Sequence, residues 1–184
     1  MESTLRKLRE TEYFLNKFKQ HASVMQRQEE AEFYLSALLS AGRSVTLVLQ
    51  VEHKQEYDQV FASCESGLQG EDSEMFKRMN TERVAAVHQT GPNFSIQQES
   101  IPIYNFYQDS TGTITVAAPP AIFMTGPPAT IFKPTYYFQM NDEPREVSIV
   151  CSRYYSLLSD LVEKVSKILR RQTAANRQNN DARS

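Results

Sequence analysis

The fold is decided by the second predicted helix, in which residues 29–52 read EEAEFYLSALLSAGRSVTLVLQVE. This stretch has no proline, and its apolar residues cover most of the circumference of a helix. A helix that is apolar nearly all round is usually buried at the centre of a bundle. Its small residues, Ser40, Ala41 and Gly42 among them, would let neighbouring helices approach closely. We therefore expect residues 28–52 to form the core helix of a helical bundle.

The chain before and after this helix continues the helical pattern. Apolar residues at helical spacing predict a first helix over residues 3–20. A third helix is expected to begin near Lys54, to break at residues 67–70, and to restart and run to His88. Gly91 and the proline that follows it then end the helix, because glycine suits the left-handed position past a helix end and proline cannot continue it.

Residues 93–140 have a different composition, because they hold many aromatic and β-branched residues and seven of the eight prolines lie between Pro92 and Pro134. The segments IPIYNFYQ and TITVA could pair as a hairpin across DSTG. The segment TIFKPTYYFQM could form another strand, with Pro134 confining it to a sheet edge or a bulge. We expect a small β insertion folded over the helices.

The last helix is expected to start after Pro144, since its apolar residues recur in steps of three and four. Residues 173–184 are polar and mildly basic, and are expected to form a disordered tail. The sequence therefore predicts a mainly α protein with one domain over residues 1–172. This domain is expected to be an up-and-down bundle of four to five helices. A small β-rich insertion at about 93–140 should precede the last helix.

Composition limits the possible functions. The chain has 184 residues, of which 40% are hydrophobic and 23% charged, with a net charge of −2, as expected for one soluble globular domain. The charge excludes the overall basic excess of many nucleic-acid-binding proteins, although not a local basic patch. No apolar run suggests a membrane span, and the two cysteines, Cys64 and Cys151, lack the spacing of a zinc site. We expect a cytoplasmic protein without a metal or other cofactor.

Of the three histidines in the chain, only one lies in a pattern that suggests a function. His21 and His53 have no second ligand at metal-binding spacing, so both are interpreted as ordinary surface residues. His88 follows Arg83 in the segment MNTERVAAVHQTGP. Helical geometry places Arg83 on the same face as an apolar stripe that includes Met79, and a charge there needs a partner, a wet interface or a ligand.

The R-x4-H pattern of Arg83 and His88, near the end of the third helix of a four-helix bundle, resembles the signature of the HEPN (higher eukaryote and prokaryote nucleotide-binding) superfamily. The resemblance implies a homodimer whose two motifs meet at the interface and act as a metal-independent endoribonuclease, often of toxin–antitoxin or defence type. RNA and a cognate protein would then be its partners. The residue after the arginine is commonly polar in active members but is Val84 here, and Asn80 could supply the missing amide.

The chemistry of such a site follows from its residue types. A histidine with a pKa of about 6.5 can exchange protons as the 2′-OH attacks the phosphate, and an arginine can stabilise the growing charge. Arg43 either lines the same cleft as a substrate-binding residue or is a structural arginine with a polar partner. The alternative function, favoured by Val84, is a non-catalytic helical module that binds a protein partner through the β insertion.

Overall fold

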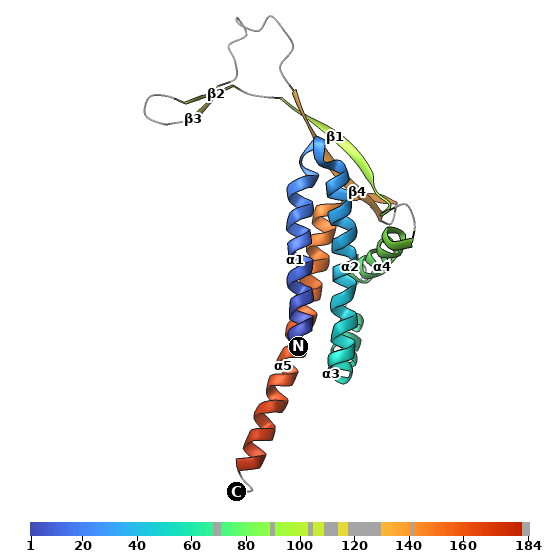
Figure 1. The fold of residues 1–184 in the computed structure, drawn as a ribbon, viewed down its shortest axis with the longest axis vertical. Coiled ribbons are helices and arrows are strands. Elements are labelled where there is room, and N and C mark those ends of the chain that lie inside the picture. Colours follow the sequence, from blue (N-terminus) through green and yellow to red (C-terminus); the bar gives the residue numbers. More distant parts are fainter. Residues whose placement is uncertain are drawn as a thin grey trace, which may run out of the picture.

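A computed structural model describes residues 1–67, 71–88, 91–102, 105–108, 114–117, 130–140 and 142–181. It confirms a mainly helical bundle with a small antiparallel sheet before the last helix (Figure 1). The helices are α1 (Glu2–Ala22), the 3-10 turn η1 (Met25–Arg27), α2 (Gln28–Glu52), α3 (Lys54–Gly67), α4 (Glu71–His88) and α5 (Val147–Asp181).

The core lies between α1, α2 and α5, which run side by side in Figure 1. One face of α2 is fully buried, as the sequence predicted for the core helix, with Leu35, Leu38 and Val45 at 0% exposure. Phe18 of α1 and Leu158 of α5 meet this face and are also inaccessible to solvent. Burial of such side chains stabilises the bundle by about 1.5–3 kcal/mol each. The opposite face of α2 is not covered in this way.

The β insertion forms two separate sheets. The larger one has the order β1 (Ser95–Pro102), β4 (Thr130–Met140), β5 (Glu143–Glu146), and all its pairs are antiparallel. The predicted hairpin is present in its inner part as β2 (Asn105–Gln108) paired with β3 (Ile114–Ala117), whereas Ile101 and Pro102 of the same predicted segment belong to β1. The turn between β2 and β3 lies outside the described residues. Alternate residues of β4 point to the helices, so Tyr136 and Phe138 are buried. The larger sheet thus closes one end of the core.

Pro134 lies in β4, which is the central strand of the larger sheet and not an edge strand as expected. Its partner is Gln98 of β1, whereas β5 pairs only with the last four residues of β4, from Tyr137 to Met140. The half of β4 that contains Pro134 therefore has a neighbour on one side only. A proline without a backbone N–H is compatible with that position.

The last helix begins at Val147, after Pro144 as predicted, but Glu143 and Pro144 of the predicted start signal belong to a strand. Residues 143–146 pair with the end of β4 as β5, through a tight turn in which Asp142 adopts a left-handed φ of 62°. Aspartate tolerates this conformation better than most residues. The tertiary pairing of the strand thus overrides the local helix-start signal of proline.

α5 continues through residues 173–181, which we expected to belong to a disordered tail. This segment has no glycine or proline and contains alanine, arginine and glutamine, which are good helix formers, so the helix propagates past its last buried residue. Residues 182–184 lie outside the described part of the chain.

By length and composition, α2 is also the one described helix that could cross a membrane. Less than half of its most apolar window is buried inside the bundle. The core helix of a soluble protein passes the same test, so this property does not decide where the protein acts.

Candidate functional site

The arginine of the R-x4-H motif lies on α4, at the edge of the buried face of that helix. The centre of this face is formed by Met75, Met79 and Glu82, which are 7%, 2% and 1% exposed. Arg83 is half-buried beside them. The expectation that Arg83 itself occupies the centre of the apolar stripe is therefore wrong, because Glu82 takes that place.

Arg83 has an unsatisfied polar atom. Its Nε is buried and has no hydrogen-bond partner among the described residues. Nor does a described carboxylate lie within ion-pair distance of its guanidinium group. A buried donor without an acceptor costs about 1–3 kcal/mol, a cost that an acceptor on a bound ligand would remove.

Arg43 of α2 approaches the same place as Arg83. Burial raises the pKa of the Tyr154 hydroxyl on α5, and the positive charges of both Arg43 and Arg83 oppose that rise. Both guanidinium groups thus act on one buried phenol at the crossing of α2, α4 and α5. Arg43 and Arg83 thus share Tyr154 as a common neighbour, and whether the two line one cleft stays a prediction.

The crossing is tight because position 42 has no side chain. A Cβ atom added to Gly42 would lie only 2.5 Å from Cε1 of Tyr154. The ring of Tyr154 packs edge-on against Phe76 of α4, with the ring centroids 5.6 Å apart. Gly42 therefore lets α5 approach α2 at the point where Arg43 begins its side chain.

Arg43 also has the structural partner that the alternative interpretation required. Its Nη1 donates a hydrogen bond to Oγ1 of Thr46 at 3.2 Å, and that hydroxyl donates in turn to the carbonyl oxygen of Arg43 at 2.9 Å. A hydroxyl partner fixes the side chain without neutralising its charge. In the described part of the chain, neither Arg43 nor Arg83 forms an ion pair with a carboxylate.

For the other predicted site residues, Asn80 and His88, the structure gives the position on α4 but no side-chain contact. Asn80 is exposed on α4, one turn before Arg83. His88 is the last residue of α4, and its side chain lies outside the described residues. The structure therefore places Arg83 and Arg43 near the same buried tyrosine and leaves the role of His88 a prediction.

A buried ion pair between Arg78 and Glu82 on α4 was not predicted from the sequence. Nη2 of Arg78 lies 2.5 Å from Oε1 of Glu82, and the backbone N–H of Asn93 donates to Oε2 of Glu82 at 2.5 Å. Arg78 also stacks over the ring of Phe138, 5.6 Å from its centroid. This cluster fastens the chain after α4 to the helix and the sheet. The spacing of four residues between Arg78 and Glu82 was the available signal.

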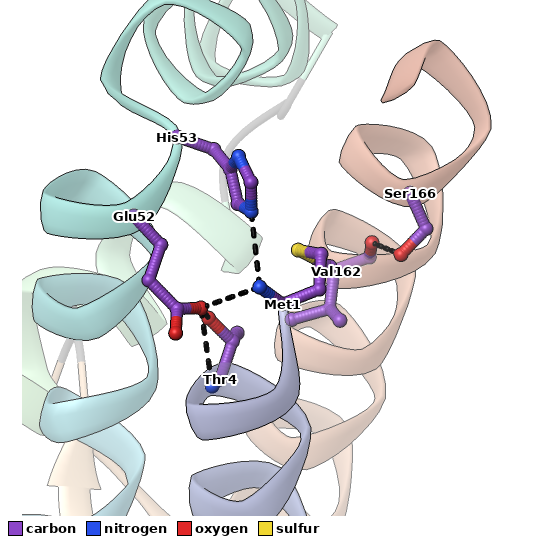
Figure 2. A network of polar contacts seen from close by, with 6 residues as sticks. All are labelled: Met1, Thr4, Glu52, His53, Val162 and Ser166. Atoms are coloured by element: carbon purple, nitrogen blue, oxygen red, sulfur yellow. Dashed lines mark hydrogen bonds and ion pairs between the residues drawn. The ribbon is translucent and has the colours of Figure 1, made fainter. Parts of the chain in front are cut away.

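The other two histidines have structural contacts. His21 was expected at the surface but is 6% exposed. Its ring is tilted against that of Tyr34, and its Nδ1 lies 2.5 Å from Oε2 of Glu30. This close approach does not meet the geometry of a hydrogen bond. His53, at the end of α2, accepts a hydrogen bond at Nε2 from the amino group of Met1 at 3.0 Å, as Figure 2 shows.

The contacts in Figure 2 form a clamp between the start of α1 and the end of α2. Glu52 accepts a hydrogen bond from the hydroxyl of Thr4 at 2.6 Å, and its carboxylate lies 2.9 Å from the Met1 amino group. These partners, the Thr4 hydroxyl foremost, lower the pKa of Glu52 to about 2. The clamp satisfies its own charges and so has the character of a structural element.

No described cluster of histidine, cysteine or acidic residues could hold a metal ion. A groove of about 190 Å³ lies between the end of α1 and the sheet, lined in part by Phe18, Lys19 and Tyr136. A second groove, of about 420 Å³, lies between Leu5 and the later turns of α5 near Arg170. Neither groove is lined by the arginines of the candidate site.

Comparisons of the chain with family profiles, with characterised proteins and with solved structures find no match, so the HEPN resemblance rests on the residues of the motif alone.

Proposed function

We propose that this chain is a dimeric, HEPN-like, metal-independent endoribonuclease of toxin or defence type that acts in the cytoplasm. One observation carries the proposal: Arg43 of α2 and Arg83 of α4 lie near enough to the buried Tyr154 for the charge of each to lower its pKa, and no described carboxylate forms an ion pair with either arginine. Two fixed cations without counter-ions favour an anionic ligand, and arginine binds phosphate oxygens with paired donors.

In this mechanism the 2′-oxygen of a ribose attacks the neighbouring phosphorus. The P–O2′ bond forms and the P–O5′ bond breaks, which leaves a 2′,3′-cyclic phosphate and a free 5′-hydroxyl. His88 exchanges the protons, taking one from the 2′-OH, while a second copy of the chain supplies the histidine that protonates the leaving oxygen. Arg83 and Arg43 stabilise the charge on the non-bridging oxygens, and Asn80 contributes an amide at the exposed side of α4.

The test is cleavage of total RNA in the presence of EDTA. Wild type should produce cyclic phosphate ends. Arg83→Ala and His88→Ala should each lower the rate by about a hundredfold or more, as loss of a group acting in the transition state does. Arg83→Lys keeps the charge but loses the paired donors, so it should restore only part of the rate.

The matched control is Arg6→Ala, which removes one exposed arginine from α1. It should cleave like wild type, because a distant surface charge does not enter the reaction. Full activity of Arg83→Ala or of His88→Ala would refute the assigned site, and absence of cleavage by wild type would favour the second function below.

A second candidate function is binding of a protein partner through the β insertion. The observation that favours it is the hairpin of β2 and β3, which forms a sheet of its own. A two-stranded sheet alone is marginally stable in water, so an added strand from a partner would stabilise it.

The register of the larger sheet offers a clean test of this second function. Pro102 of β1 is paired directly with Thr130 of β4, so residues 103–129 can be replaced by an Asn-Gly turn that keeps the two strands together. Loss of a co-purifying protein from this variant, with retention of the bundle, would support partner binding. Unchanged co-purification would exclude the hairpin.

A further inference from the structure

The outer face of α2 carries a strip of six uncharged residues that the bundle leaves open. We call it the α2 strip; it consists of Phe33, Ala37, Ser40, Ser44, Leu47 and Val51. At about 100° per residue, all six lie within about 40° of the direction of Phe33. Its large members are 64% (Phe33), 45% (Leu47) and 87% (Val51) exposed, and its small members are partly exposed.

The length and chemistry of the strip are unusual for a helix face in contact with water. It runs for about 27 Å without a charged side chain. The hydroxyl of Ser44 donates to the carbonyl oxygen of Ser40 at 2.9 Å, so it is satisfied within the helix. Long exposed apolar surfaces of this kind mark sites of interaction.

The order of residues in the strip is self-complementary. The six positions are symmetric about residue 42, so two antiparallel copies of α2 would place Phe33 opposite Val51, Ala37 opposite Leu47, and Ser40 opposite Ser44. Large side chains then meet at both ends, and the small serines at the centre permit close approach of the two backbones. A two-fold interface requires this kind of self-complementarity.

The charges that border the strip select the same arrangement. Exposed Glu29 and Glu30 precede Phe33, and exposed Lys54 follows Val51. Within one chain Lys54 pairs with Asp58 at 2.6 Å and Glu30 lies beside His21. Antiparallel packing brings Glu30 of one copy opposite Lys54 of the other, so that each joins a contact that already exists, whereas parallel packing would bring like charges together.

We propose that the α2 strip binds a second copy of this chain, with the two α2 helices antiparallel about a two-fold axis at residue 42. This defines an interface that the proposed function does not specify, and it holds whether or not the protein cleaves RNA. Arg43 lies about 80° from the strip. The two-fold axis therefore places Arg43 of both copies along the same edge of the interface, where a single phosphate chain could contact both.

The first test is the mass of the protein in solution, measured by light scattering across a dilution series. Wild type should have twice the chain mass of 21.1 kDa. Leu47→Asp should raise the dimer dissociation constant about a hundredfold or more, because the charge is buried twice, with a factor of ten or more for each copy. Ile149→Asp on α5, where the side chain is 64% exposed, is the matched control and should remain dimeric.

The second test fixes the orientation and does not require a destabilising change. Ser40→Cys and Ser44→Cys chains, each made with Cys64→Ser, are mixed and oxidised; the remaining Cys151 is buried. A mixed disulfide between the two variants should form faster than either disulfide between identical chains, because only opposed positions meet the distance that a disulfide needs. Faster disulfides between identical chains would overturn the antiparallel interface.

Two further outcomes would overturn the proposal. One is a monomeric wild type throughout the dilution series. The other is flotation of wild type, but not of Leu47→Asp, with phosphatidylcholine vesicles, which would make lipid the occupant of the strip. A dimer that lacks RNA cleavage would leave this interface standing and refute only the proposed function, so the two failures are distinguishable.

Discussion

Gly42→Ala should destabilise the protein, although alanine is the better helix former. A Cβ atom at position 42 would lie 2.5 Å from Cε1, 3.1 Å from the hydroxyl oxygen and 3.2 Å from Cζ of Tyr154. The ring cannot yield cheaply, because Tyr154 is only 5% exposed and packs against Phe76.

The expected size follows from two opposing terms. Alanine in place of glycine inside a helix contributes about 1 kcal/mol of stability. Overpacking a rigid core contact costs about 1–3 kcal/mol. The net loss for Gly42→Ala should therefore be about 1 kcal/mol, which lowers the Tm of a chain of this size by about 2–4 °C.

A double-mutant cycle with Tyr154→Leu isolates the contact. In the Tyr154→Leu background the ring is absent, so Gly42→Ala should stabilise the protein by about 1 kcal/mol through helix propensity alone. Urea unfolding of the four proteins, followed by circular dichroism, should give a coupling energy of about 2 kcal/mol. If Gly42→Ala changes stability equally in both backgrounds, the close approach of α2 and α5 does not exist as described.

Two other predictions concern charges that the fold holds in place. The pKa of Glu52 is lowered from 4.5 to about 2, chiefly by the Thr4 hydroxyl, so its contribution to stability is complete above pH 4.5 and is lost as the pH falls towards 2. Thr4→Val should raise the pKa of Glu52 and weaken this acid-dependent loss of stability, measured as the Tm at a series of pH values. The control is Thr11→Val, because the Thr11 hydroxyl donates to a backbone carbonyl at 2.8 Å. Thr11→Val should lower the stability without changing its pH dependence. Arg78→Ala leaves the buried Glu82 without its cation and should lower the free energy of unfolding in urea by about 3–5 kcal/mol. A much smaller loss would contradict a buried ion pair between these two residues.

The bundle could be predicted from the sequence because helical periodicity reports directly on which faces are buried. The segment around Leu38 shows it most clearly, since it is apolar on several sides and lies at the centre. The strand at residues 143–146 could not be predicted, because it depends on pairing with a strand that precedes it in the chain.

The candidate site was predictable in part. The spacing of Arg83 and His88 identified α4, but periodicity alone could not decide between Glu82 and Arg83 for the buried face, since neighbouring positions differ by only about 100°. The approach of Arg43 to Tyr154 joins residues from α2 and α5, and no local pattern encodes such a contact. The small residues around Gly42 were the local sign of a close crossing.

The length of α5 has a consequence for how the end of the molecule moves. Its 35 residues span about 52 Å, and in Figure 1 the helix continues well past the N-terminus, with residues 170–176 exposed. Past the bundle, this helix is stabilised by the intrinsic helix propensity of its residues and not by tertiary packing. A short helix that relies on propensity alone is only marginally stable in water. Amide protons should therefore exchange faster with each turn towards Asp181, and warming should shorten the helix from that end while the bundle stays folded. The exposed cations at Lys167, Arg170 and Arg171 thus sit on a segment whose order depends on temperature and on whatever binds it.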